Sequence, residues 1–122
     1  MIVGIGVDVV DLARFERAVT RAPKLIDRLF ASSEQAGEGR DLSLQSLAGR
    51  FAAKEALIKA LGNSAGVRWH DLRVITDEHG APSFNLSGGV AAHASARGIH
   101  HFHLSITHDA GIAMAFVVAE SA

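Results

Sequence analysis

The sequence predicts one α+β domain over residues 1–122, with an antiparallel sheet packed around a central helix. Three observations favour this fold class. The 122 residues, 48% hydrophobic and 20% charged, suffice for one globular core but not for two. The predicted elements follow the order β-α-α-α-β-β-α-β-β, without regular βαβ alternation. One long helix is apolar over most of its circumference, which is typical of a helix at the centre of a domain.

The first part of the chain predicts a strand and two helices. Residues 2–9 are apolar and β-branched, as in a buried strand. Asp11 is a good N-cap for a helix over residues 12–21. Pro23 then either ends that helix or opens a second one, which continues to Phe30.

The middle of the chain predicts a loop, the central helix and a hairpin. The turn-forming composition of residues 32–43 predicts a mobile surface loop. The long helix covers about residues 42–61 and is closed by Gly62. Strands at 72–76 and 83–86 then pair as a hairpin.

The last part of the chain predicts one helix and two strands. Ser87 is expected to cap a helix over about residues 90–97, and Gly98 ends it. Alternation predicts a strand at 101–107, and a turn joins it to the last strand at 112–119.

Composition excludes several classes of function. The sequence has no cysteine, which excludes disulfides, thiolate metal sites and a cysteine nucleophile, and which fits a reduced cytosolic compartment. A net charge of −1 predicts no bulk attraction to nucleic acid or to a membrane surface. No apolar run reaches the roughly 18 residues of a membrane helix. We therefore expect a cytoplasmic protein with neither a nucleic acid nor a membrane partner.

Asp8 is an acid in an otherwise apolar strand. Because side chains alternate along a strand, Asp8 shares its face with Gly4 and Gly6, which add no bulk to that face. Glycine inside a strand often marks close approach by a ligand or by another backbone. The alternative is that Asp8 lies at the strand end and helps Asp11 to cap the next helix.

Glu55 interrupts an apolar stripe of the long helix, while Leu57 and Leu61 cover another side of that helix. Burying a lone carboxylate is costly unless a cation or hydrogen-bond donors compensate. Lys59, one turn later, could be a structural partner at i, i+4, and otherwise Glu55 is functional. The stripe consists of Leu44, Leu47, Ala48, Phe51 and Ile58.

Two misplaced acids on different elements predict one shared cation. Oxygen ligands without cysteine favour Mg²⁺, which proteins usually hold by one or two carboxylates together with water and substrate phosphates. The basic residues Arg50, Lys54 and Lys59 on the same helix support a phosphate ligand. Arg50 and Lys54 would alternatively form a solvated helix face.

The histidines predict no zinc site. His101 and His103 would face the same way on a strand, but no third ligand has the spacing to complete such a site. His108 differs because it lies where a strand ends and a turn begins, a position from which functional side chains reach a cleft.

A basic stripe follows the first helix. Arg14, Arg17 and Arg21 recur at i, i+3 and i+7 and so lie on one face. This face is either the solvent side of an amphipathic helix or a docking surface for an acidic helical partner. A local basic stripe on a nearly neutral chain fits a specific protein partner better than a polyanion.

Three sequence blocks carry a family resemblance: GIGVDVVDLARF at 4–15, RFAAKEALIKALG at 50–62 and HLSITHDAGIAMAFVVAE at 103–120. In order and spacing they resemble the bacterial holo-(acyl-carrier-protein) synthases, the small class of 4′-phosphopantetheinyl transferases. The KEA core with a downstream lysine is specific when it follows an N-terminal GxGxD strand. The resemblance covers essentially the whole chain, although the middle hairpin and residues 32–43 carry no matching motif.

This resemblance implies a reaction. Coenzyme A is cleaved at its pyrophosphate, its phosphopantetheine arm moves to a serine of an acyl carrier protein, and 3′,5′-ADP leaves. Asp8 and Glu55 match the family's Mg²⁺ ligands. Lys59 matches the lysine associated with the coenzyme A phosphates and with catalysis.

The resemblance also implies further contacts. Coenzyme A would be bound by Arg50, Thr107 and His108. The serine proton would be taken by Glu55, directly or through a metal-bound water, or alternatively by His108. Family members of this size are typically homotrimers with active sites at subunit interfaces.

The basic stripe has a natural target in this resemblance, because carrier proteins of this kind are strongly acidic. Arg14 and its helix, including Arg17 and Arg21, match the surface that meets the carrier. Two alternatives from other classes are a coenzyme A-binding module without transfer activity and an assembly protein whose acids are satisfied internally.

Overall fold

The computed structural model describes residues 1–37, 40–64 and 66–122 of the chain. No helix in these ranges is long and apolar enough to cross a membrane. In chain order the elements are β1 (Ile2–Asp11), α1 (Leu12–Arg21), α2 (Leu25–Leu29), the 3₁₀ helix η1 (Ser32–Glu34), β2 (Ala36–Gly37), β3 (Arg40–Asp41), α3 (Leu44–Leu61), the 3₁₀ helix η2 (Trp69–Asp71), β4 (Leu72–Thr76), β5 (Pro82–Leu86), α4 (Gly88–Ala96), β6 (Ile99–Asp109) and β7 (Ile112–Ser121).

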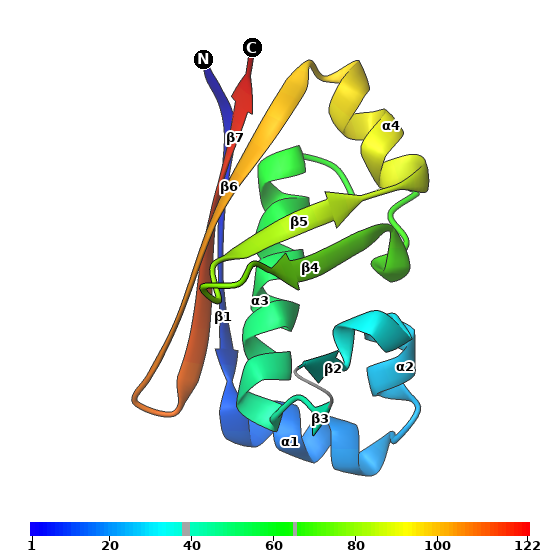
Figure 1. Cartoon of the computed structure of the whole chain (residues 1–122), viewed down its shortest axis with the longest axis vertical. Coiled ribbons are helices and arrows are strands. Elements are labelled where there is room, and N and C mark those ends of the chain that lie inside the picture. The colour runs from blue at the N-terminus through cyan, green and yellow to red at the C-terminus, as the bar shows by residue number, and fades with distance from the viewer. Residues whose placement is uncertain (38–39, 65) are drawn as a thin grey trace.

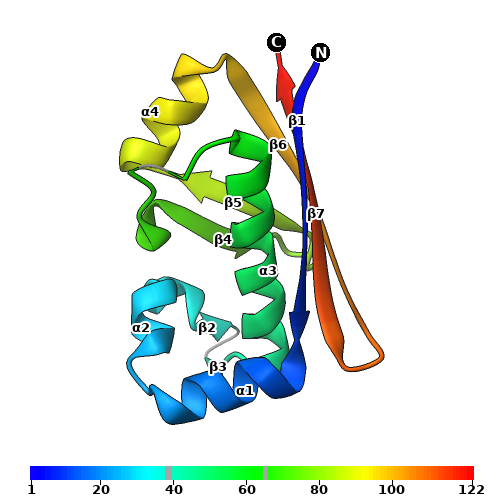
Figure 2. The same ribbon diagram turned by 180° about the vertical axis from the view of Figure 1, so that it is seen from behind.

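Helix α3 lies at the centre of the molecule. A long antiparallel sheet in the order β1-β7-β6 covers one side of α3, and the β4–β5 hairpin with α4 lies on the other side (Figure 1). The helices α1 and α2 gather around the N-terminal end of α3, as the view from behind also shows (Figure 2). This arrangement confirms the predicted α+β fold class.

The strands form separate sheets instead of the one sheet expected. β7 pairs with both β1 and β6, whereas β4 pairs only with β5. The hairpin approaches the long sheet through side chains: the rings of Phe84 on β5 and Phe102 on β6 lie 6.3 Å apart, edge to face. Packing between aromatic side chains thus replaces backbone pairing at this junction.

The glycines of β1 bring the strand directly onto the backbone of α3. A Cβ atom added at Gly4 would overlap the carbonyl of Ala60, and one added at Gly6 would overlap the carbonyl of Ala56. The alanines on this side of α3 are fully buried. The predicted close approach is confirmed, and the approaching group is another backbone.

The helix ends follow the predicted signals closely. Asp11 Oδ1 accepts a hydrogen bond from the Arg14 backbone N–H at 2.9 Å and caps α1. Pro23 lies in the break between α1 and α2, so it ends the first helix. Helix α3 is capped by Ser43, and Gly62 closes it with a left-handed φ of 88°.

Three local predictions are wrong. Residues 2–9, expected to be a buried strand, form β1 with one face open, on which Ile5, Val7 and Val9 are 46% to 61% exposed. The segment 32–43, expected to be a surface loop, contains η1, and its Glu34 is only 1% exposed because it pairs with a buried lysine of α3. Residues 38–39 of this segment lie outside the described residues. Ser87 precedes α4 but makes no side-chain cap bond, and its Oγ lies 3.5 Å from Asp71 Oδ1.

Candidate active site

Asp8 faces α3 and meets a lysine there. Its Oδ1 accepts a hydrogen bond from Lys59 Nζ at 3.2 Å, and Lys59 also donates to the Val7 carbonyl at 2.8 Å. The Asp8 side chain is 19% exposed. Asp11 alone caps α1, so the alternative of a capping role for Asp8 does not hold.

Glu55 is half-buried on α3, in the neighbourhood of the same two residues. Burial raises the pKa of Glu55, the nearby Asp8 carboxylate raises it further, and the Lys59 ammonium lowers it in part. Within the described residues, the ion pair of Lys59 is with Asp8 and not with Glu55. Among the residues that the structure describes, Glu55 therefore has no ion pair of its own, and the Lys59 ammonium acts on it only from beside Asp8.

Both carboxylates line one cavity of about 690 Å³, together with Arg14, Phe51 and Trp69 among other residues. In the parts of the chain that the structure describes, no group of three His, Cys, Asp or Glu side chains is arranged to hold a metal ion. Two carboxylates fit Mg²⁺, which retains several waters and shares its coordination with substrate phosphates. The pair would therefore hold Mg²⁺ only with further oxygen ligands from water and substrate.

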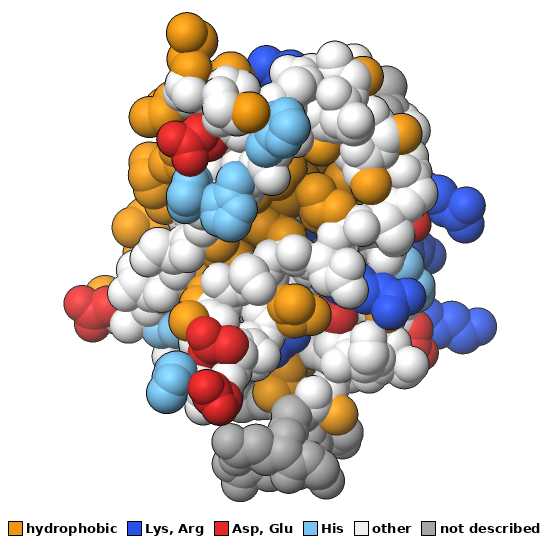
Figure 3. Space-filling model, turned by 45° about the horizontal axis from the view of Figure 1, so that its top comes forward, with side chains coloured by type: hydrophobic (Ala, Val, Ile, Leu, Met, Phe, Trp, Pro, Cys, Tyr) orange, Lys and Arg blue, Asp and Glu red, His pale blue; other side chains and the backbone are white. Residues whose placement is uncertain are grey.

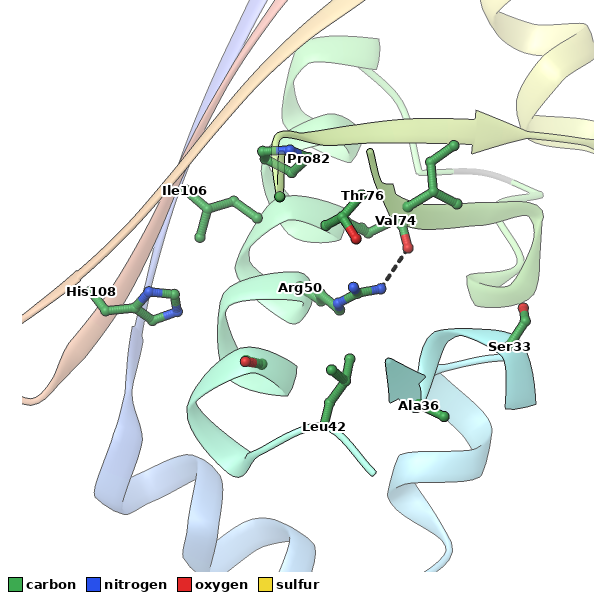
Figure 4. A pocket seen from close by; sticks show the side chains of 12 residues that line it. Ser33, Ala36, Leu42, Arg50, Val74, Thr76, Pro82, Ile106 and His108 are labelled. Atoms are coloured by element: carbon green, nitrogen blue, oxygen red, sulfur yellow. Dashed lines mark hydrogen bonds between the residues drawn. The ribbon is translucent and has the colours of Figure 1, made fainter. Parts of the chain in front are cut away.

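A second cavity of about 640 Å³ contains Arg50 and His108 (Figure 4). Arg50 Nη1 donates to the Val74 carbonyl at 2.6 Å, which fixes the guanidinium in the cavity beside Thr76. Burial lowers the pKa of Arg50, and the Glu34 carboxylate raises it. A half-buried guanidinium fixed in a cavity is suited to binding a phosphate group.

His108 reaches this cavity because the helix opposite it carries a glycine. A Cβ atom at Gly49 would lie 2.7 Å from His108 Nε2, and that nitrogen is 3.1 Å from the Gln45 carbonyl oxygen. Thr107 is exposed, pairs with Met114 and, by strand alternation, faces away from α3. The structure therefore brings Arg50 and His108 together, but not Thr107.

The three arginines of the basic stripe are exposed on α1. Arg14 lines the cavity of the two carboxylates, and Arg28 of α2 joins it there. Arg17 and Arg21 line a neighbouring groove with Glu16. The sequence pattern had singled out Arg14, whereas the place of Arg28 depends on how α2 folds back after Pro23.

For Lys54, the predicted alternative of a solvated helix face is wrong. Its side chain is 0% exposed, and its Nζ lies 2.8 Å from Glu34 Oε1. The signal for burial was present, since Leu57 and Leu61 follow Lys54 by three and seven residues and share its side of α3.

His101 and His103, which share one face of β6, contact each other. The rings of His101 and His103 lie 4.3 Å apart, and His103 Nε2 is 3.0 Å from Glu120 Oε1. The hydrogen bond from His103 lowers the pKa of the Glu120 carboxyl.

Comparison with known proteins assigns the family. The family model described as the 4′-phosphopantetheinyl transferase superfamily matches residues 4–117. A holo-[acyl-carrier-protein] synthase of Leifsonia xyli is 61% identical over 98% of this chain and 98% of its own length. The crystal structure of the Neisseria meningitidis synthase has a TM-score of 0.85 at 33% identity, covering 99% of this chain and 100% of that one.

A second solved structure carries a ligand. The Bacillus anthracis holo-(acyl-carrier-protein) synthase, in complex with CoA (3′,5′-ADP), has a TM-score of 0.80 at 37% identity and covers 100% of this chain and 99% of that one. The matches span nearly the full length of the chain, and the resemblance predicted from the three sequence blocks is confirmed. The chain belongs to the holo-[acyl-carrier-protein] synthases, enzymes of the 4′-phosphopantetheinyl transferase superfamily.

Proposed function

We propose that this protein transfers the 4′-phosphopantetheine arm of coenzyme A to a serine of an apo acyl carrier protein and releases 3′,5′-ADP, in fatty acid or polyketide biosynthesis. One observation carries the proposal: Asp8 and Glu55, remote in the chain, line one cavity beside Lys59. The ligand in the Bacillus anthracis relative supports coenzyme A as the substrate.

Asp8 and Glu55 are the residues that would hold Mg²⁺. Burial and then the Asp8 carboxylate raise the pKa of Glu55, so the charged form of Glu55 is disfavoured. A cation shared by the two carboxylates would stabilise that charged form. Bound Mg²⁺ would supply positive charge at the diphosphate. Lys59, 54% exposed and fixed by Val7 and Asp8, adds a second positive charge at the same place.

The remaining roles follow from the two cavities. Arg50 and His108 would bind coenzyme A phosphates in their shared cavity, and Thr107 would contribute only from the far side of β6. We assign the general base to Glu55, because its cavity also contains Arg14, where the carrier is proposed to dock. A general base of this kind contributes about 10²–10⁴-fold to the rate.

A homotrimer would join the two cavities. The outer face of the long sheet exposes Ile5, Val7, Val9 and Phe116, each between 46% and 61% exposed. Hydrophobic side chains are visible along the left edge of the molecule, where this sheet lies (Figure 3). Such a face supports self-association, and neighbouring subunits could then supply one cavity each to a shared site.

The single domain over residues 1–122 and the cytoplasmic location stay predictions from the sequence. The acyl carrier protein is the proposed partner, and its acidic character suits the exposed arginines Arg14, Arg17 and Arg21 on α1.

The test is a mass measurement on an apo carrier protein after incubation with coenzyme A and Mg²⁺. Wild type should add one phosphopantetheine group, and Glu55→Gln and Asp8→Asn should each lose about a hundredfold or more of kcat/KM, because they remove charge stabilisation at the diphosphate. Coenzyme A binding by calorimetry without any mass shift would instead favour a binding module. Near-normal turnover of Glu55→Gln would overturn the metal assignment.

A further inference from the structure

A buried ion pair crosses the interior between the two cavities. The side chains of Lys54 on α3 and Glu34 on η1 are 0% and 1% exposed, and Lys54 Nζ lies 2.8 Å from Glu34 Oε1. Neither residue lines either cavity, and neither has a part in the proposed reaction. A buried ion pair is weak evidence for stability, since desolvation offsets its attraction, so its presence here calls for another role.

The side chain of Lys54 is hydrogen-bonded to two segments that line the cavity of Asp8 and Glu55. Its ammonium donates to the Leu29 carbonyl at 2.6 Å and to the Trp69 carbonyl at 3.0 Å, besides its bond to Glu34. Leu29 and Trp69 both line that cavity. The three N–H donors of the ammonium thus have three acceptors, which fixes α2 and η2 relative to α3.

Glu34 connects the same pair to the other cavity. Its Oε2 accepts a hydrogen bond from the Val74 N–H at 2.9 Å, and its Oε1 accepts from the Ala31 N–H at 2.9 Å. The carbonyl of Val74 in turn accepts from Arg50. The chain of bonds therefore runs from Trp69 at one cavity to the guanidinium of Arg50 at the other.

We propose that the buried Lys54–Glu34 pair is a positioning device that holds the walls of the two cavities in a fixed position relative to each other. The side chain at each end of the pair is hydrogen-bonded to the backbone of a cavity wall. A shift at one wall is therefore transmitted to the other. Lys54 is also the residue next to Glu55, so its bonds fix the turn of α3 that carries the proposed metal ligand and base. This role rests on the proposed function.

The test uses two variants and two readouts. Lys54→Met removes all three donors but leaves a buried carboxylate, so the double variant Lys54→Met/Glu34→Gln, which buries no charge, guards against simple unfolding. The first readout is transfer kinetics at a temperature where circular dichroism shows the folded state. The second is acrylamide quenching of Trp69, which is the only tryptophan of the chain and therefore the only source of tryptophan fluorescence.

The double variant should lose about tenfold or more in kcat, because a small misplacement of catalytic groups is costly. The KM for coenzyme A should change by less than about threefold, since Arg50 and His108 are retained and the amide oxygen introduced by Glu34→Gln can still accept from the Val74 N–H. Acrylamide quenching of Trp69 should increase about twofold, because the hydrogen bond from Lys54 to the Trp69 carbonyl is lost and this segment becomes more mobile. The control is Val90→Ala, a fully buried residue of α4 that lines neither cavity, which should lower stability and change neither readout.

Unchanged kcat and unchanged Trp69 quenching in the folded double variant would overturn the inference. Equal changes in Val90→Ala would also overturn it, because the pair would then act only through general stability. If wild type modifies no carrier protein, the proposed function fails separately. The Trp69 quenching then decides whether the pair holds the cavity wall.

Discussion

Glu55 opposes the stability of the fold at the proposed site. Its pKa is raised by burial and then by Asp8, so the folded protein binds this proton more tightly than the unfolded chain does. Such a group favours folding fully below its ordinary pKa of 4.5, and the contribution is lost as the pH rises through the raised value. Without divalent metal, the ionised Glu55 therefore weakens the fold at neutral pH.

Glu55→Gln should consequently have a higher Tm than wild type at about pH 8, and the difference should shrink toward about pH 4, when measured without divalent metal. The reason is that glutamine carries no charge to bury at either pH. Thermal unfolding followed by circular dichroism checks this. Glu16→Gln, on the exposed surface of α1, is the matched control and should not reproduce the trend. An equal or lower Tm for Glu55→Gln at the higher pH contradicts the stated environment.

At the residue scale, candidate site residues could be recognised in the sequence where a charged side chain interrupted a hydrophobic pattern. Asp8 in an apolar strand and Glu55 in an apolar stripe were visible because each is a charge among hydrophobic neighbours. The leucines three and seven residues after Lys54 indicated its burial, but its partner could not be recognised, because Glu34 lies in a segment whose composition predicted an exposed loop. An ion pair between distant segments has no signature in the pattern of either one.

At the element scale, the contact between β1 and α3 fixes the distance between the two proposed metal ligands. Gly6→Ala should destabilise the protein by about 2 kcal/mol or more, because the new methyl group would meet the Ala56 carbonyl, which is backbone and cannot move aside. Urea unfolding measures this. Gly98→Ala is the control: beyond its chain neighbours, no atom of the described residues lies within 4 Å of its added Cβ, so only its positive φ of 71° opposes alanine, at about 1 kcal/mol. Equal losses in the two variants would mean that β1 can move away from α3.

Helix α1 is the element proposed to meet the carrier. Arg14→Glu should raise the KM for the carrier protein about tenfold, since the charge reversal repels an acidic partner, and the effect should weaken at high salt. The KM for coenzyme A should stay nearly constant, because Arg14 does not line the Arg50 cavity. Steady-state kinetics with each substrate varied separately makes the comparison. Arg68→Glu, an exposed arginine outside the described cavities, is the control, and a similar loss there would point to net charge alone.

Most elements could be predicted because their ends carry strong local signals. Asp11 and Gly62 mark helix ends through capping chemistry that depends only on neighbouring residues. The separation of the β4–β5 hairpin from the long sheet could not be predicted, because it depends on the Phe84–Phe102 contact between separate segments. Predicted element order was therefore more accurate than predicted sheet pairing.

At the scale of the whole molecule, the two cavities explain why a site could be predicted only in part. Sequence blocks named the residues Asp8, Glu55, Arg50 and His108 together, but the chain divides them between separate cavities. Nothing in a single sequence says whether residues of one motif set meet within a subunit or across an interface. The association of subunits is the property on which a shared site depends.

The outer face of the long sheet is where that association should be tested. Val7 and Phe116 are paired neighbours on adjacent strands, and each is 46% exposed. Phe116→Glu should convert the proposed trimer to monomer in sedimentation velocity, because a carboxylate buried in an apolar interface costs more than the contact gains. Transfer activity should fall with the trimer, since neither cavity alone holds all the proposed groups. Ala92→Glu, on the exposed surface of α4, is the matched control and should remain trimeric and active. A wild-type protein that sediments as a fully active monomer would show instead that one chain contains the complete site.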